Sequence, residues 1–356
     1  LNYLHLRPYL TQHMKKNLIS NLMLACWLAF FANNLLAQAP AGYYDNANGL
    51  SGAALKTALY TIIKDHTVLS YDNLWTAYPS TDERQDGKVW DMYSNCSFTF
   101  GTDQCGNYSG ECDCYNREHS FPKSWFNDAS PMYSDIFHIV PTDGYVNGRR
   151  SNYPFGETSN PTYTSENGCK LGPCSYSGYT GTVFEPVDEY KGDFARIYFY
   201  MATRYENVIS AWHANSTEAE TVLQNNSFPV YESWFLHMLG EWHVADPVSQ
   251  KEIDRNNVIY TNFQHNRNPY VDHPEYVYAV WGVGEPVGLP EPDNYPADFS
   301  AHNIHLQWSD ATGTVLPTGY LIRMSAVGFG DIAAPADGLT YSNATDFTVP
   351  YGQQEL

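Results

Sequence analysis

The sequence reads YNREHSFPKS over residues 115–124 and DIFHIVPTDGYVNGRR over residues 135–150. These two segments contain a Glu-His dipeptide (Glu118 and His119), a second histidine (His138), an asparagine and two adjacent arginines. A candidate base, candidate metal ligands and candidate phosphate anchors therefore lie close together in the chain. The interpretation of the whole sequence starts from this region.

A short helix is predicted after residues 141–143, which read Pro-Thr-Asp, because the Thr or the Asp suits a helix N-cap. Asn147 would then lie about one turn into that helix. In an extended strand Glu118 and His119 would point to opposite faces, but at a strand end or a bulge both can reach one cleft. A strand-end histidine facing a helical asparagine would combine a base with a metal site.

Phosphodiester hydrolysis needs these residue types. The attacking water must lose a proton, and His119 suits that task because the unperturbed pKa of histidine, about 6.5, lies near working pH. The developing charge on the phosphate oxygens needs a cation. Glu118 and Asn147 offer hard oxygen ligands for Mg²⁺, which keeps most of its waters. The two segments therefore favour metal-assisted phosphodiester hydrolysis.

These motifs resemble the bacterial endonuclease I family, and the resemblance extends over about residues 42–282. It rests on five segments in the family's order: 117–125, 135–141, 144–153, 193–201 and 266–271. The family consists of exported or periplasmic nucleases with a His-Me finger (ββα-metal) active site. The resemblance implies an α+β fold, with a His-Me finger core and several packed helices.

By this resemblance His119 is the general base, and Glu118 and Asn147 ligate one Mg²⁺, with Mn²⁺ or Ca²⁺ able to substitute in binding. The implied activity is sequence-nonspecific cleavage of DNA, and often of RNA, to 5′-phosphate products. The sequence departs from the family at Cys112 and Cys114, just before the motif, where the family is Gly-rich with fewer cysteines. This departure concerns the local loop and not the chemistry.

Four further residues are candidates for phosphate or site contacts, each with a structural alternative. Lys123, Arg149 and Arg150 could bind phosphate, although cations also favour a helix C-terminus. His138 lies between apolar residues and is either a core histidine or a residue lining the site. Arg196 lies beside an apolar helical stripe, so a buried structural ion pair is expected there.

Residues 1–37 are interpreted as upstream residues and a signal peptide. Met14 is followed by two lysines, residues 18–31 are largely apolar, and small residues follow near residue 37. The protein is predicted to be exported, either to the periplasm of a bacterial cell or beyond the cell. Because the apolar run is short for a membrane span, no stable span is predicted after cleavage. A lipoprotein signal at Cys26 is the alternative.

The formal net charge is −20. Such a charge argues against a nucleic-acid packaging protein, which would be basic overall. It does not exclude an enzyme that handles a polyanion at one local basic cleft. The acidity mainly favours solubility.

Of 7 cysteines, all but Cys26 lie beyond the leader. In an exported protein these six favour disulfides. A bond between Cys169 and Cys174 would close a short loop, whereas the pairing of the others is not fixed by the sequence. Cys112 and Cys114 also suggest a metal site, but a structural zinc normally needs four ligands.

The chain is divided into a nuclease domain at 38–284, a Pro-rich linker at 285–297 and a truncated fibronectin III-like β module at 298–356. Apolar residues alternate in that last part, but an immunoglobulin-like sandwich needs about 100 residues. Helical spacing predicts helices at 53–65, about 190–212 and about 231–244, with another beginning at Asp246-Pro247. Residues 70–115 are expected to form loops and short strands, for example at 88–93.

Together these features predict a secreted, monomeric, Mg²⁺-dependent, sequence-nonspecific endonuclease acting on DNA, with RNA left open as a second substrate. The alternative is a non-catalytic surface- or glycan-binding protein on a nuclease-like scaffold, which the acidic composition, the 29 tyrosines and the β module would suit. A phosphodiesterase for another substrate is the third possibility. The preference between DNA and RNA and the role of the C-terminal module are not fixed by the sequence.

Overall fold

The computed structural model describes residues 39–284 and, beyond them, 299–302, 305–308, 323–324 and 354–355. The chain divides into two units, Leu1–Gly284 and Glu285–Leu356. The predicted signal peptide (1–37) and linker (285–297) lie outside the described residues. The candidate site belongs entirely to the first unit.

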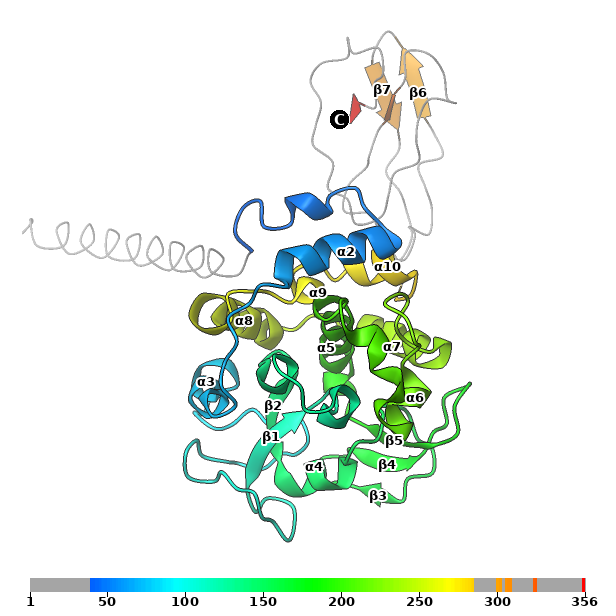
Figure 1. Ribbon diagram of the computed structural model, residues 1–356. Coiled ribbons are helices and arrows are strands. Elements are labelled where there is room, and N and C mark those ends of the chain that lie inside the picture. Colours follow the sequence, from blue (N-terminus) through cyan, green and yellow to red (C-terminus); the bar gives the residue numbers. More distant parts are fainter. Residues whose placement is uncertain (1–38, 285–298, 303–304, 309–322, 325–353, 356) are drawn as a thin grey trace, which may run out of the picture. The chain divides into compact units, whose positions relative to one another are not determined.

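Helix α5 (Lys191–Arg204) forms the centre of the first unit, and all of its residues are buried. It ends at Arg204, with Tyr205 as its C-cap, earlier than the predicted residue 212, and short 3₁₀ turns follow it. Around α5 lie the other helices (Figure 1): α2 (Gly52–Ile63), α3 (Asn73–Thr81), α4 (Gly144–Arg150), α6 (Thr217–Val222), α7 (Ser233–Ala245), α8 (Gln250–Val258), α9 (Pro269–Asp272) and α10 (Tyr276–Trp281). The predicted helices at 53–65 and 231–244 are thus confirmed as α2 and α7.

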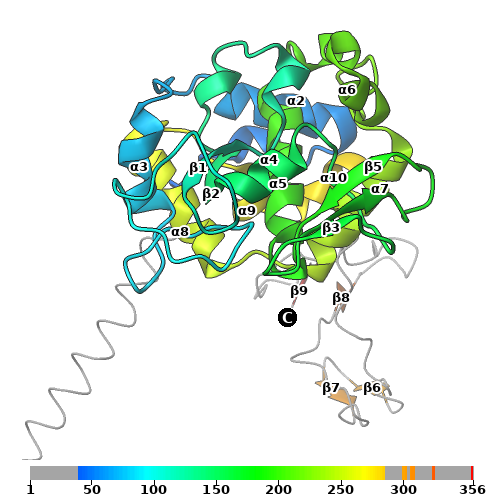
Figure 2. The ribbon, with the colours of Figure 1, turned by 90° about the horizontal axis from the view of Figure 1, so that it is seen from below.

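Two small antiparallel sheets complete the first unit, so the fold is α+β as predicted. Strand β1 (Tyr115–His119) pairs with β2 (Ile139–Asp143), with Tyr115 opposite Asp143 and His119 opposite Ile139. The other sheet has the order β3 (Tyr163–Thr164), β4 (Lys170–Pro173), β5 (Thr182–Glu185). In both views the β1–β2 hairpin and α4 lie between α3 and this second sheet (Figures 1 and 2).

The structure corrects the prediction of loops and strands at 70–115. Helix α3 lies there, and its buried residues Leu74, Ala77, Tyr78 and Thr81 have helical spacing. The stripe is hard to recognise because Pro79 and several Thr and Ser residues are weak helix formers. No strand forms at 88–93, where Val89 makes only an isolated bridge to Glu83.

The start of α8 also differs from the prediction. Its N-cap is Ser249, which forms a capping box with Glu252. Asp246 instead accepts a hydrogen bond from the backbone N–H of Gly192, 2.9 Å away. The reciprocal Ser-x-x-Glu arrangement satisfies two helix-start donors, which an Asp-Pro start would not.

In the second unit, β6 (Phe299–His302) pairs with β7 (His305–Trp308), and β8 (Arg323–Met324) pairs with β9 (Gln354–Glu355). Strands β7 and β8 lie where apolar residues alternate in the sequence of this part. The remainder of the predicted fibronectin III-like module lies outside the described residues.

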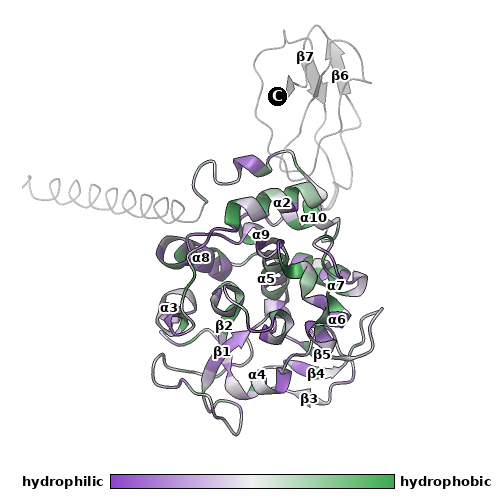
Figure 3. Cartoon of the chain, viewed as in Figure 1, coloured by the Kyte–Doolittle hydropathy of each residue, from purple (hydrophilic) through white to green (hydrophobic). Residues whose placement is uncertain are grey.

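Strand β1 and helix α8 are coloured hydrophilic in Figure 3, although several of their side chains are buried. In α8, Arg255 donates to Asp82 and to the backbone carbonyl of Ile136 in the segment before β2. Buried polar groups are tolerated when they are paired in this way. Helix α8 therefore fixes the approach to β2 by hydrogen bonds and not by apolar packing.

Asp135, also in the segment before β2, is the most heavily bonded of the buried carboxylates near the site. It accepts hydrogen bonds from the hydroxyls of Tyr200 and Tyr205, the side chain of Gln264 and the backbone N–H of Phe137. Burial raises the pKa of Asp135, but neighbouring histidines and these hydrogen bonds outweigh it, so its pKa is lowered. The ionised carboxylate therefore ties this segment to α5.

Asp135→Asn should lower the free energy of unfolding by about 2–4 kcal/mol, because an amide cannot accept all four hydrogen bonds. Since folding lowers this pKa, the carboxylate's contribution is present above the unfolded pKa of about 3.9 and is lost as pH falls through the folded value. Urea unfolding at pH 7 measures the difference, with Asp65→Asn, at an exposed position, as the control. Equal stability of the two variants would contradict the assigned role.

Candidate active site

The candidate site is built from β1, β2 and α4, which begins directly after β2. The Asp143 side chain caps α4 by accepting from the backbone N–H groups of Tyr145 and Val146, at 2.8 and 3.0 Å. The predicted cap is confirmed, and Asn147 lies one turn into the helix as expected. The strand–strand–helix order around the Glu-His dipeptide is therefore present.

Two hydrogen bonds join α4 to one face of β1. Asn147 Nδ2 donates to Asn116 Oδ1 at 2.7 Å, and Arg150 Nη1 donates to Glu118 Oε1 at 2.7 Å. Residues two apart in a strand share a face, and residues three apart in a helix are neighbours. Glu118 and Asn147 therefore lie on the same side of β1, the side covered by α4.

This arrangement leaves one oxygen of each candidate ligand without a hydrogen bond from the described residues. Tyr93 also donates to Glu118, and both of the carboxylate's hydrogen bonds use Oε1, so Oε2 remains. The Asn147 amide is held through Nδ2, so its Oδ1 remains. Two hard oxygens of this kind fit a divalent cation such as Mg²⁺.

Glu118 is buried, and burial raises its pKa even though Arg150 and Tyr93 favour its ionised form. In the ion pair with Arg150 the two charges compensate each other, so the pair as a whole is neutral. A cation bound at Oε2 would further favour ionisation.

His119 is the last residue of β1 and packs on the other face of the strand. Its ring lies 5.7 Å from that of Tyr71, 5.2 Å from that of Tyr133 and 5.5 Å from that of His138. Its Nε2 lies 3.2 Å from the backbone carbonyl of Tyr133. Since a carbonyl can only accept, Nε2 bears the proton and Nδ1 keeps its lone pair.

The surroundings also keep this imidazole neutral. Burial, followed by the charge of His138 and those of Lys123 and Arg117, holds the pKa of His119 well below its usual value. A neutral ring with a free Nδ1 is the form that a general base needs.

The predicted site residues therefore fall into two groups. Glu118 and Asn147 lie on the α4 side of β1, and His119 lies on the opposite side. No hydrogen bond within the described residues joins His119 to Asn147. Their convergence on one cleft at the end of β1, expected from the sequence, remains a proposal.

The other candidates occupy different environments. Lys123 is exposed and pairs with Asp128 at 2.8 Å, and Arg149 is exposed over the ring of Tyr163. His138 is fully buried, with its Nε2 2.7 Å from the backbone carbonyl of Met132. It supports His119 from inside the core and is not placed to contact phosphate.

Arg150 is likewise not placed to contact a phosphate. Its side chain is 1% exposed, and besides Glu118 it donates to the backbone carbonyls of His119 and Ser120 at 3.0 and 2.7 Å. It therefore holds the end of β1 and positions Glu118. Arg196 behaves as expected, forming a buried ion pair with Glu252.

Sequence reasoning missed three residues that hold the site in place: Tyr93, Asn116 and Tyr133. Asn116 had a recognisable signal, because it precedes Glu118 by two residues and so shares its strand face. Tyr93 comes from a loop and the Tyr133 carbonyl from a short 3₁₀ turn (Met132–Ser134), and the approach of these segments to the site leaves no local pattern.

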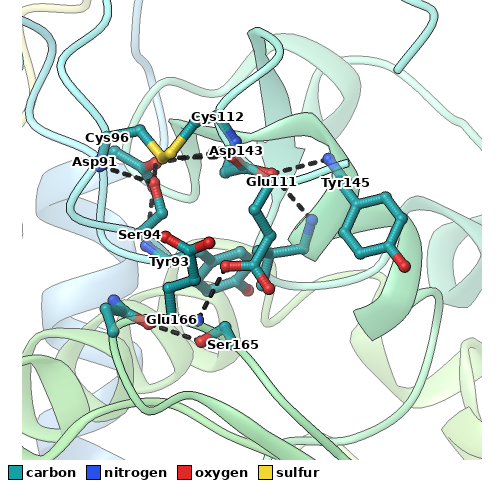
Figure 4. The surroundings of a disulfide bond; sticks show 12 residues. Asp91, Tyr93, Ser94, Cys96, Glu111, Cys112, Asp143, Tyr145, Ser165 and Glu166 are labelled. Atoms are coloured by element: carbon teal, nitrogen blue, oxygen red, sulfur yellow. Dashed lines mark hydrogen bonds between the residues drawn. A yellow bond between two sulfur atoms is a disulfide. The ribbon is translucent and has the colours of Figure 1, made fainter. Parts of the chain in front are cut away.

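The loop before β1 is closed by two disulfides, Cys96–Cys112 and Cys105–Cys114. Figure 4 shows the first of them beside the start of α4: the backbone N–H of Cys112 donates to Asp143 Oδ2 at 2.6 Å. The backbone N–H of Asp143 in turn donates to Asp91, whose pKa burial raises to about 7. The disulfide loop is thus attached to the N-cap of α4.

Disulfides are therefore confirmed, but the suggested Cys169–Cys174 pair is wrong, since both cysteines are free. Strand β4 extends between them, so at about 3.3 Å per residue their Cα atoms lie far beyond the reach of a disulfide, about 7 Å. Cys112 and Cys114 are in disulfides, which removes the thiolates that a metal site there would need.

The same loop packs onto α4 through Tyr108. Its ring lies against Gly144 and Gly148, where a Cβ at either position would overlap it. Glycine at both positions lets the disulfide loop approach the helix that bears Asn147.

Comparisons with known proteins identify the family of this chain. Residues 51–275 match the model of the family described as Endonuclease I. An extracellular ribonuclease of Bacillus amyloliquefaciens is 38% identical over 243 residues, covering 67% of this chain and 78% of that protein. An extracellular ribonuclease of Bacillus subtilis (strain 168) is 36% identical with the same coverage. Endonuclease-1 of Buchnera aphidicola subsp. Acyrthosiphon pisum is 27% identical over 139 residues, 39% of this chain and 44% of that protein.

The chain is therefore a nuclease with a mixed helix and sheet fold. It belongs to the Endonuclease I family, as the sequence motifs indicated. The family match ends before the C-terminal strands and gives no support to a fibronectin III-like module. Among the described helices, none has the length and apolar character that crossing a bilayer requires.

Arg150→Met should lower the free energy of unfolding by about 3–5 kcal/mol, because it leaves the buried Glu118 carboxylate uncompensated. Adding Glu118→Gln, which removes the charge but keeps an acceptor for Tyr93, should recover at least about 1 kcal/mol. Chemical denaturation of both variants measures this, with Arg149→Met as the exposed control. A double variant no more stable than Arg150→Met would contradict the ion-pair account.

Proposed function

We propose that this chain is an exported, Mg²⁺-dependent endonuclease that hydrolyses phosphodiester bonds in DNA and RNA without sequence specificity, leaving 5′-phosphates. The observation that supports it most is His119: its Nε2 is held by a backbone carbonyl, its Nδ1 keeps the lone pair, and burial keeps the ring neutral. Glu118 and Asn147, on the other side of the same strand end, supply the oxygens that a cation would need.

In this proposal Nδ1 of His119 accepts the proton of the attacking water. Glu118 Oε2 and Asn147 Oδ1 would hold one Mg²⁺, and Mn²⁺ or Ca²⁺ would substitute in binding. When bound, the cation supplies positive charge that stabilises the phosphate oxygens and the departing 3′ oxygen. The scissile phosphate would lie across the end of β1, because only there can it approach both groups.

Three neighbours position these groups. Arg150 and Tyr93 fix the Glu118 carboxylate through Oε1, and Asn116 fixes the Asn147 amide through Nδ2. Such partners orient metal ligands and often matter nearly as much as the ligands themselves.

Two further observations support export. The N-terminal residues have the pattern of a signal peptide, and the two disulfides suit an oxidising compartment. The Bacillus relatives are named extracellular ribonucleases. We infer that this chain acts outside the cytoplasm.

Plasmid nicking tests the activity. Wild-type protein should nick supercoiled DNA with Mg²⁺ and not with EDTA, and His119→Ala should reduce the rate by about 10²–10⁴-fold. His237→Ala, at an exposed position on α7, is the matched control and should cut at the wild-type rate. Undiminished cutting by His119→Ala would reject the base assignment, and binding without any cleavage would favour the non-catalytic alternative.

Asn116→Leu tests the metal ligands independently of catalysis. Without the Asn116 acceptor the Asn147 amide is no longer held in orientation, so the affinity for Mg²⁺ or Mn²⁺ should fall by about 10–100-fold. Calorimetric titration of the metal into the protein, without nucleic acid, measures the change. Asn225→Leu, at an exposed position, serves as the control, and unchanged affinity in Asn116→Leu would argue against Asn147 as a ligand.

A further inference from the structure

A group of aromatic and basic side chains surrounds His119 on its face of β1. This aromatic–cation strip consists of Tyr71, Trp75, Arg117, Lys123 and Tyr133. Arg117 precedes His119 by two residues and shares its strand face. Tyr71 contacts both: its ring is nearly parallel to that of His119, at 21°, and its centroid lies 3.5 Å from the Arg117 guanidinium carbon.

Arg117 is held in place by aromatic rings and a backbone carbonyl, and no buried carboxylate of the described residues pairs with its charge. Its guanidinium lies between the rings of Tyr71 and Trp75, at 3.5 and 4.5 Å, and donates to the Tyr71 carbonyl at 2.6 Å. The only carboxylate paired with it in the described part of the chain is Asp72, at 3.4 Å, whose side chain is 93% exposed. Exposed ion pairs of this kind are weak and screened by water. The guanidinium therefore presents a fixed positive charge beside the base.

Tyr133 packs next to both Tyr71 and His119. Its ring centroid is 4.6 Å from that of Tyr71 and 5.2 Å from that of His119, and Lys123 Nζ lies 5.7 Å from it. The rings of Tyr71 and Tyr133 are only partly buried, in contrast to the many tyrosines packed around α5. The strip therefore combines two partly exposed aromatic rings with two cations, Arg117 beside Tyr71 and Lys123 beside Tyr133.

The position of these charges is informative because the whole chain has a formal net charge of −20. In an acidic protein, long-range attraction does not bring a polyanion to the surface, so local cations must hold it. Arg117 and Lys123 flank the candidate base closely enough to lower the pKa of His119.

We propose that the aromatic–cation strip binds a single-stranded segment of the nucleic-acid substrate, with an unpaired base stacked on Tyr133 and a phosphate beside the scissile one held by Arg117. Stacking on an aromatic side chain contributes about 1–3 kcal/mol per base and tolerates any base. Paired bases are stacked within a duplex and cannot reach the ring, so the strip adds affinity for single strands without preventing cleavage of a duplex. This inference rests on the proposed nuclease function of the same site.

Binding measured without metal isolates the strip from catalysis. In EDTA, fluorescence anisotropy compares a labelled single-stranded oligonucleotide, its duplex, and the same strand with abasic residues. Wild-type protein should bind the intact single strand about 5–150-fold more tightly than the abasic strand, the range that 1–3 kcal/mol of stacking gives. Equal affinity for the intact and abasic strands would overturn the proposal without any variant.

Substitutions then locate the contacts. Tyr133→Leu should bind the intact strand as weakly as wild type binds the abasic strand, and should no longer distinguish the two, whereas Tyr133→Phe should behave as wild type. Arg117→Met should reduce the slope of log affinity against log salt by about 0.7, with Arg84→Met, at an exposed ion pair, as the control. Retained discrimination in Tyr133→Leu, or an unchanged slope in Arg117→Met, would contradict the assignment.

The two proposals can fail separately. If the wild-type protein cuts no nucleic acid with Mg²⁺, the proposed function is wrong. If it cuts but binds intact and abasic strands equally, only the strip assignment is wrong.

Discussion

The candidate site depends on one buried guanidinium. Arg150, at the end of α4, bonds the Glu118 carboxylate and the carbonyls of the next two residues of the β1 segment. A buried charge is tolerated where it is paired and hydrogen-bonded. Arg150 meets this condition through Nη1 and Nη2, while its Nε has no partner among the described residues. This contact joins the helix that bears Asn147 to the strand that bears the Glu-His dipeptide. It thereby sets the distance between the proposed metal ligands and the proposed base.

The same strand presents different chemistry on its two faces. On the α4 side, Asn116 and Glu118 bond polar partners, and the oxygens left for the proposed cation are Glu118 Oε2 and Asn147 Oδ1. On the other side, Arg117 and His119 meet aromatic rings and a backbone carbonyl. Alternation along a strand lets neighbouring residues serve these separate environments without competing for the same partners. A phosphate at the strand end would be the point at which the two environments combine.

Much of this arrangement could be predicted from local patterns. The α4 cap, the position of Asn147 in the first turn, and helices α2 and α7 follow from residue types a few positions apart. Local patterns did not show which of the adjacent Arg149 and Arg150 would be buried. Successive residues of a helix point about 100° apart. That rotation places Arg150 inside and leaves Arg149 in solvent. Disulfide pairing, the Tyr133 carbonyl and the strip around His119 depend on loops brought together by the fold, so the sequence had no local signal for them.

Helix α5 has no solvent-facing side, and this has a consequence for how the family can diversify. Its charged residues need partners inside the protein: Arg196 pairs with Glu252, Lys191 pairs with Glu185, and Arg204 donates a hydrogen bond to His66. Each of these partners is then constrained by the others, so a change in one requires a compensating change elsewhere. New substrate preferences would therefore be acquired more readily through surface loops, such as the segment bearing Tyr71, than through the centre of the molecule. The paired charges inside the molecule thus tolerate fewer single substitutions than its surface loops do.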